Sequence, residues 1–213
     1  ASGGRQPNAF KTNASGGVPN TQAYDNYMDA FDATVAGMSE AELAATVGIG
    51  SNELINLPFG NGSERMLNNQ NLGTHFCNLN LNIHGQEHLF RSALEGIAFS
   101  FVYGMEIMKA DGIDISVIRA GNDNLFQSEI FSTTFSSLIS HPIEIYNTTG
   151  AVGAARAAGL EKGVLNELSR SSNDFDKVRE ILPESDTQKY KETYEKWKLV
   201  LEQKILNNDT YRR

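Results

Sequence analysis

A repeated strand–turn–helix pattern in residues 113–159 constrains the fold of this chain more than any other feature. Two short β-branched runs, residues 115–118 and 143–146, each end in a turn rich in Gly, Asn or Thr, and each turn opens a helix pattern. The free N–H groups of such a turn and the dipole of the following helix can hold a phosphate or nucleotide. Ordinary βα turns of an α/β domain have the same pattern, so both interpretations stay open.

The order of these elements predicts a parallel pair of strands joined by a right-handed crossover. We expect Asn124 to cap the first helix, with Gln127 three residues later completing a capping box. Thr148 or Thr149 is expected to cap the second helix. The apolar side chains expected to face the sheet from the first helix are Phe131, Phe135 and Leu138.

Two long stretches have the apolar periodicity of helices. Residues 88–110 carry apolar side chains at spacings of three and four, interrupted by Gly96 and Gly104. Because glycine inside a helix costs about 1 kcal/mol relative to alanine, these two predict close packing of another backbone. An amphipathic terminal helix is predicted from Tyr190, Tyr194, Trp197, Leu201 and Ile205, and residues 168–183 before it are predicted to be a loop. Another helix is predicted to begin at residues 39–43, because Glu40 and Glu42 would lie in its first turn.

The segment between the helix start at residues 39–43 and residue 88 has the pattern of a two-stranded ribbon. Residues 53–59 predict a short strand that ends at Pro58, because proline cannot donate to a ladder. A turn at residues 60–65 is expected to have positive φ at its two glycines. An alternating half-buried strand is predicted from Phe76, Leu79, Leu81 and Ile83.

Three histidines in this region, His75, His84 and His88, suggest a metal site at first sight. Only His84 and His88 have the spacing of a pair on one helix face, and no carboxylate–histidine motif accompanies them. We therefore expect solvated or hydrogen-bonded histidines, and no metal ligands among the residues of this chain.

Composition restricts the partners. The net charge of −8 and pI near 5.0 argue against nucleic acid or an anionic membrane as the main partner. A single cysteine, Cys77, excludes a disulfide framework, and no apolar run reaches the ~18 residues of a transmembrane helix. A cytoplasmic location is the default expectation. The polar, Gly-rich first 20 residues contain no acidic side chain and suggest a chain cut from something longer.

Four sequence blocks occur in a specific order: F-G-N-G-S-E-R-M-L (59–67), H-L-F-R-S-A-L-E-G-I-A-F-S-F-V-Y-G-M-E-I-M (88–108), I-R-A-G-N-D-N-L-F (118–126) and Y-N-T-T-G-A-V-G-A-A-R-A-A-G (146–159). Together they closely resemble the C-terminal domain of the FGGY carbohydrate kinases, and within that family the xylulose kinases.

That resemblance implies an α/β fold: an actin-like ATPase, ribonuclease H-like domain with a mixed sheet flanked by helices. It implies that residues 1–213 form the C-terminal, nucleotide-binding domain and that the N-terminal sugar-binding and catalytic domain is absent from this chain. The expected cofactors are ATP and Mg²⁺, and the expected substrate is a ketopentose, D-xylulose, phosphorylated at its terminal hydroxyl. Ribulose, gluconate, rhamnulose or glycerol kinases, and a non-catalytic assembly module, are the alternatives. The N-terminal domain and a second copy of the chain are the expected protein partners.

The resemblance also implies the positions of the nucleotide site. The aspartate that accepts the hydroxyl proton belongs to the other domain, so no catalytic residue is expected here. An earlier glycine loop would face the phosphates or ribose, and a later loop, with one glycine where many family members carry several, would lie on the adenosine side. The residues expected to bind the nucleotide are Gly16, Gly17 and Asn20 in the first loop, and Gly121, Asn122 and Asn124 in the second.

Overall fold

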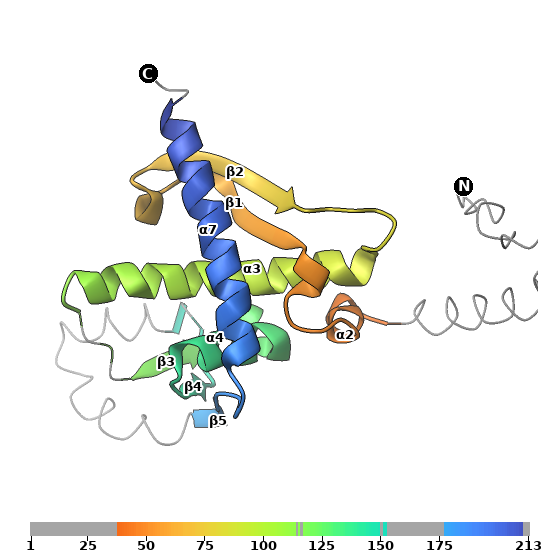
Figure 1. The fold of residues 1–213 in the computed structure, drawn as a ribbon. Coiled ribbons are helices and arrows are strands. Elements are labelled where there is room, and N and C mark those ends of the chain that lie inside the picture. Colours follow the sequence, from red (N-terminus) through yellow and green to blue (C-terminus); the bar gives the residue numbers. More distant parts are fainter. Residues whose placement is uncertain (1–37, 114, 116, 150, 153–176, 211–213) are drawn as a thin grey trace, which may run out of the picture. The chain divides into compact units, whose positions relative to one another are not determined.

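The computed structural model describes residues 38–113, 115, 117–149, 151–152 and 177–210 (Figure 1). The helices are α2 (Glu40–Ala45), α3 (Gln86–Ala110), α4 (Glu129–Ile139) and α7 (Gln188–Thr210), with short 3-10 helices η1 (Ser51–Glu53), η2 (Arg65–Leu67) and η3 (Asn124–Gln127). The strands are β1 (Ile55–Glu64), β2 (Gln70–Cys77), β3 (Ile118–Gly121), β4 (Ile143–Tyr146) and β5 (Lys177–Ile181).

A small mixed sheet has the strand order β3-β4-β5. Strands β3 and β4 are parallel, with Gly121 opposite Tyr146, and β5 is antiparallel to β4. The predicted parallel pair is therefore confirmed, and β4 has the predicted bounds. The first strand was predicted too early, at residues 115–118: pairing begins at Ile118 and continues to Gly121, while Val117 is half exposed.

Helix α3 contacts both the β1–β2 ribbon and α4, and it lies between the ribbon and the small sheet in Figure 1. Its buried face confirms the predicted core helix. A Cβ atom at Gly96 would lie 2.4 Å from the carbonyl oxygen of Asn56, so this glycine does permit close approach of another backbone. Gly104 does not, because its nearest neighbour is the Met66 side chain, 3.7 Å away.

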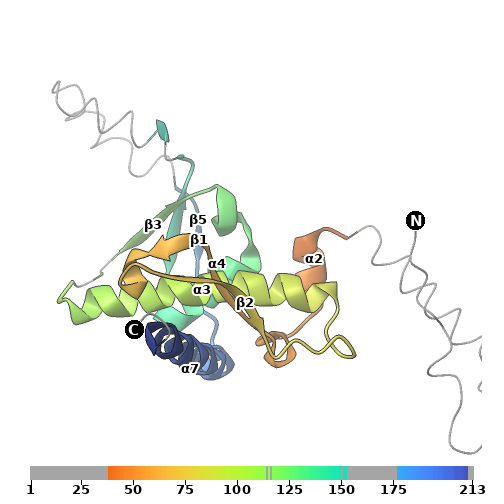
Figure 2. The same cartoon turned by 90° about the horizontal axis from the view of Figure 1, so that it is seen from above.

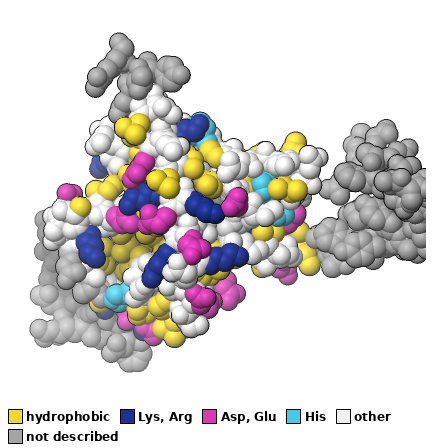
Figure 3. All heavy atoms as spheres, in the orientation of Figure 1, with side chains coloured by type: hydrophobic (Ala, Val, Ile, Leu, Met, Phe, Trp, Pro, Cys, Tyr) yellow, Lys and Arg dark blue, Asp and Glu magenta, His cyan; other side chains and the backbone are white. Residues whose placement is uncertain are grey.

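Helix α7 crosses α3 and is seen nearly end-on in the view from above (Figure 2). Its side chains Tyr190, Tyr194, Trp197 and Leu201 are buried, which confirms the predicted amphipathic helix. The Trp197 indole N–H donates to the Asn56 carbonyl at 2.7 Å, next to Gly96. On the outer surface, basic and acidic side chains are interspersed (Figure 3), as in the pair of Lys196 with Glu53 at 2.8 Å.

The ribbon differs from its prediction. Strand β1 continues through Pro58 to Glu64, so neither the strand end at Pro58 nor the turn at residues 60–65 is correct. Among the described residues β1 pairs only with β2, and a strand with one unpaired edge tolerates proline. The register shifts between Phe59 and Ser63, where Gly62 has the expected positive φ of 106° but Gly60 does not have a positive φ. The chain reverses later, at Asn68 and Asn69.

The predicted strand through Ile83 is correct only as far as Cys77. Beyond it Leu79, Leu81 and Ile83 are exposed, and this segment, which leads into α3, pairs with none of the strands that the structure describes. The histidines are hydrogen-bonded, as expected: the buried His84 accepts from the Asn80 N–H at 3.0 Å and contacts the Asn52 carbonyl at 3.1 Å.

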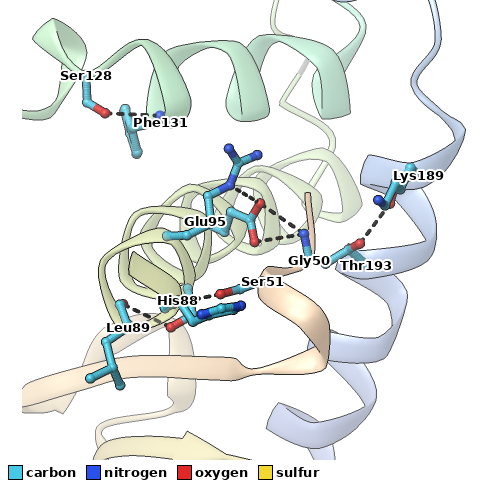
Figure 4. Close-up of polar contacts among 11 residues, drawn as sticks. Gly50, Ser51, His88, Leu89, Glu95, Ser128, Phe131, Lys189 and Thr193 are labelled. Carbon is cyan, nitrogen blue, oxygen red and sulfur yellow. Dashed lines mark hydrogen bonds and ion pairs between the residues drawn. The ribbon is translucent and has the colours of Figure 1, made fainter. Parts of the chain in front are cut away.

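A buried ion pair fixes the turn before β1 to α3 (Figure 4). The Glu95 carboxylate accepts from the Gly50 N–H at 3.1 and 3.2 Å and from Arg91 Nε at 2.7 Å. Burial raises the pKa of the Glu95 carboxyl, and Arg91 opposes that shift. The contact holds a turn in which Ser51, Asn52 and Glu53 all have positive φ, at 44°, 53° and 68°.

Residues 177–181 form strand β5, so the loop predicted for 168–183 is wrong over these residues. The earlier part of that prediction lies outside the described residues. Four of the five β5 residues are exposed, which leaves little apolar periodicity to predict a strand. No helix in the described part of the chain has both the length and the apolarity needed to cross a bilayer.

Candidate nucleotide-binding site

The turns that follow the parallel strands β3 and β4 lie against each other. A Cβ atom at Gly121 would be 2.5 Å from the Thr148 carbonyl oxygen and 2.9 Å from Asp123 Oδ1. The Asn122 N–H donates to the Tyr146 carbonyl at 2.8 Å, and so does the Thr148 N–H, also at 2.8 Å. Ligands of open α/β sheets bind at the carboxyl ends of parallel strands, which is where these two turns meet.

The first turn has a 3-10 helix between its glycine and α4. Ser128 caps α4, with its hydroxyl accepting from the Phe131 N–H at 3.4 Å (Figure 4). The predicted cap at Asn124 is therefore wrong, because Asn124 begins η3 one turn earlier. Gln127 does not complete a capping box either: its side-chain amide donates to the Asn122 carbonyl at 3.1 Å and closes the turn on itself.

The second turn begins another helix. The Thr149 hydroxyl accepts from the Val152 N–H at 3.4 Å, so Thr149 is the capping residue of the two that were predicted. Residues 151 and 152 are helical, and residues 153–159 of this sequence block lie outside the described part of the chain.

Strand β5 contributes a contact that the sequence analysis missed. Arg179 Nη2 donates to the Phe126 carbonyl in η3 at 2.6 Å, and the Ser132 hydroxyl donates to the same carbonyl at 3.0 Å. The signal was the alternation in K-V-R-E-I, which is too short and too polar to be distinguished from a loop.

A cluster of polar side chains lies on the face of the small sheet that is opposite to the buried Ile143 and Ile145. Glu144 accepts from Arg119 at 3.0 Å, from the Tyr146 hydroxyl at 2.8 Å and from Lys177 at 3.3 Å. The hydrogen bonds from Arg119 and then Tyr146 lower the pKa of the Glu144 carboxyl to about 2. Arg119 and Lys177 are therefore both paired with this carboxylate, and neither is an unpaired cation at the nearby turns.

The structure thus brings Gly121 and Asn122 together with the Thr148 turn, and it places the backbone of Asn124 at the start of η3. The Asn124 side chain, like Gly16, Gly17 and Asn20, lies outside the described part of the chain. Within the described ranges, no group of three or more His, Cys, Asp or Glu side chains is arranged to hold a metal ion.

A separate groove of about 630 Å³ lies between β1 and the second half of α3. Its walls are mainly apolar and include Phe59, Met66, Phe101 and Met105. None of its lining residues belongs to the turns at Gly121 and Thr148, so the groove is distinct from the candidate site.

Comparison with known proteins identifies kinases. The chain is 33% identical to the glycerol kinase of Vibrio vulnificus over 119 residues, which are 52% of this chain and 22% of that protein. It is 32% identical to the glycerol kinase of Haloferax volcanii over 124 residues, 56% of this chain and 24% of that protein. The chain therefore spans about a quarter of the length of these relatives. No family model matches it.

Solved structures of similar fold are also kinases. Xylulose kinase from Rhodospirillum rubrum gives a TM-score of 0.62 at 19% identity, covering 84% of this chain and 37% of that one. Plasmodium falciparum glycerol kinase with ADP gives 0.62 at 19% identity, covering 78% and 33%. Gluconate kinase from Lactobacillus acidophilus gives 0.62 at 17% identity, covering 81% and 35%. These relatives and structural neighbours are carbohydrate kinases of the FGGY family, and the chain has their actin-like ATPase fold.

Proposed function

We propose that this chain is the C-terminal, nucleotide-binding domain of an FGGY carbohydrate kinase. The complete protein would transfer the γ-phosphoryl group of ATP to the terminal hydroxyl of D-xylulose, giving D-xylulose 5-phosphate. The observation that carries this proposal is the contact between the Gly121 and Thr148 turns at the carboxyl ends of two parallel strands. This is the position at which an actin-like fold can bring backbone N–H groups close to a nucleotide.

In this proposal the domain acts by positioning the nucleotide. Gly121 keeps the first turn close enough to the second for both to contact one ligand. Asn122 and Asn124 would lie along the adenosine side. Gly16, Gly17 and Asn20 would contact the phosphates or ribose. The basic side chains Arg119 and Lys177 are already paired with Glu144, and bound Mg²⁺ would neutralise part of the phosphate charge.

The proton acceptor would be an aspartate of the N-terminal domain. Phosphoryl transfer needs little covalent chemistry from the protein, so alignment of the two substrates would supply most of the rate enhancement. Closure of the two domains would exclude water, which otherwise competes with the sugar as acceptor. The N-terminal domain is therefore the principal protein partner in this proposal, with a homodimer in the cytoplasm as the assembled form.

D-xylulose is supported by the sequence blocks at residues 59–67, 88–108, 118–126 and 146–159, which resemble those of xylulose kinases. The structural neighbours do not distinguish the substrate, because xylulose, glycerol and gluconate kinases all match at a TM-score of 0.62. Glycerol is a second candidate, because both curated relatives described above are glycerol kinases. We place the groups that would distinguish a ketopentose from glycerol in the N-terminal domain.

Two measurements test the proposal. Calorimetric titration of the 213-residue chain with MgADP should give saturable binding. A coupled assay of the complete protein should show ATP-dependent phosphorylation of D-xylulose in preference to D-ribulose, gluconate, L-rhamnulose and glycerol. Preference for glycerol would replace the substrate assignment, and absence of phosphorylation of every polyol and sugar by a folded, complete protein would refute the kinase proposal.

A further inference from the structure

We propose that Arg179 is a positioning residue for the nucleotide turn: by holding the Phe126 carbonyl, it fixes the conformation in which residues 121–127 bind the nucleotide. The inference rests on the proposed function for its ligand. The hydrogen bond itself, 2.6 Å from Arg179 Nη2 to the carbonyl oxygen across 53 residues of sequence, does not depend on that function.

The sheet register directs Arg179 toward the turn. Arg179 is opposite Ile145 in the antiparallel β4–β5 pair, and directly opposed residues share one face of a sheet. Ile145 is completely buried, in the same core cluster as Phe131 and Phe135 of α4. Arg179 therefore leaves β5 on the face of Ile145, toward η3 and α4. The register of the β4–β5 pair shifts between Ile145 and Tyr146, so Lys177, although two residues from Arg179, is opposite Tyr146 and pairs with Glu144 in the polar cluster.

The turn is held at both ends by side chains. At its beginning the Gln127 amide donates to the Asn122 carbonyl at 3.1 Å, and at its end the Phe126 carbonyl accepts from both Arg179 and Ser132. A carbonyl oxygen has two lone pairs, so these two donors satisfy it fully. The Phe126 ring meets the buried Phe131 ring edge-on, with centroids 5.2 Å apart, and this contact ties the same residue to α4.

Charge distinguishes Arg179 from the other cations of the sheet. Arg119 and Lys177 both form ion pairs with Glu144. Of the carboxylates that the structure describes, none is paired with Arg179, so its hydrogen bond to Phe126 does not compete with an ion pair. A short hydrogen bond from a charged donor is about twice as strong as a neutral one. The Arg179 side chain therefore links strand β5 to the turn that follows β3.

The test compares Arg179→Gln, Arg179→Lys and the matched control Lys177→Gln, which removes a cation from the same strand on the other face. Amide hydrogen exchange over residues 122–128 reports the turn, and MgADP titration reports the ligand. We expect R179Q to raise the exchange rate about tenfold, as for loss of one charge-assisted hydrogen bond, and to weaken MgADP binding about three- to tenfold. R179K should restore part of both, and K177Q should change neither.

The two readouts separate the possible failures. Unchanged exchange in R179Q would show that Arg179 does not hold the turn. Faster exchange with unchanged MgADP affinity would overturn the positioning role. If the wild-type chain does not bind MgADP at all, the proposed function is refuted, and the role of Arg179 in nucleotide binding is refuted as well. The exchange measurement would still decide whether Arg179 fixes the conformation of the turn. Equal loss of thermal stability in R179Q and K177Q would assign the effect to the strand instead.

Discussion

Replacing Gly96 with alanine should destabilise the protein, although alanine is the better helix former. Gly96 lies in the middle of α3, at a close approach of the β1 backbone. The new Cβ would lie 2.4 Å from the Asn56 carbonyl oxygen and 3.2 Å from its carbonyl carbon. Both neighbours are backbone atoms of a paired strand, so neither can move aside as a flexible side chain would.

The magnitude follows from three opposing effects. Alanine favours the helix by about 1 kcal/mol. Overpacking of a buried contact costs about 1–3 kcal/mol. The same carbonyl accepts the Trp197 indole N–H at 2.7 Å, and separating β1 from α3 would weaken that buried hydrogen bond, at a cost of about 1–3 kcal/mol if the N–H is left unpaired. The net loss in the free energy of unfolding should be about 1–5 kcal/mol.

Gly104→Ala is the matched control. It lies in the same helix and gains the same helix propensity, but its Cβ would meet only the Met66 sulfur at 3.7 Å, an ordinary contact. Urea denaturation followed by Trp197 fluorescence should show G104A unchanged or up to about 1 kcal/mol more stable than the wild type, and G96A less stable. Equal or greater stability of G96A relative to G104A would refute the close approach of β1 to α3.

Two further predictions concern charged groups. Glu95→Ala leaves the buried Arg91 and the Gly50 N–H without their partner. It should lower the free energy of unfolding, measured in urea, by about 3–5 kcal/mol. The control Glu53→Ala removes a solvent-exposed pair with Lys196 and should leave the urea midpoint unchanged. Because the pKa of Glu144 is about 2 in the folded protein and ordinarily 4.5, its ionised form stabilises the fold above pH 4.5, and that stability is lost as the pH falls toward 2. Glu144→Gln should therefore flatten the stability profile between these pH values, and an unchanged slope would show that Glu144 is not held by Arg119 and Tyr146 in solution.

Local sequence signals predicted the elements whose contacts are regular or strongly apolar. The periodicity of residues 88–110 and the aromatic face from Tyr190 to Leu201 identify α3 and α7, because each buries one continuous stripe. The β-branched run at residues 143–146 identifies β4, whose isoleucines are fully buried. The turn at Gly121 followed from its position between a strand and a helix pattern, and the contact with Thr148 agrees with that placement.

Non-local pairing explains what the sequence did not reveal. Strand β5 is formed by pairing with β4, and its own side chains are mostly exposed, so its sequence has almost none of the apolar alternation that predicts a strand. Strand β1 continues past Pro58 because β2 is its only strand neighbour in the described part of the chain, and this depends on the sheet and not on the proline. The Arg179 contact was missed for the same reason: it joins residues 53 positions apart through a strand that was not predicted.

Competition between neighbouring caps explains the error at the start of α4. Asn124 and Ser128 are both good capping residues four positions apart, and their sequence preferences are nearly equal. In the structure Ser128 caps α4 and residues 124–127 form η3, whose Phe126 carbonyl accepts hydrogen bonds from Arg179 and Ser132. The contact with Arg179 is distant in sequence, so local capping preferences could not include it.

The most direct test of the nucleotide site is a calorimetric titration of MgADP into three proteins: the wild type, Gly121→Ala and the control Gly48→Ala. Alanine at position 121 would meet the Thr148 carbonyl at 2.5 Å and separate the two turns, whereas alanine at position 48 would meet only the Lys189 ammonium nitrogen at 3.7 Å. We predict saturable binding by the wild type and G48A, with affinity reduced at least tenfold in a folded G121A. Equal affinity in all three proteins would contradict a nucleotide site at the meeting point of these turns.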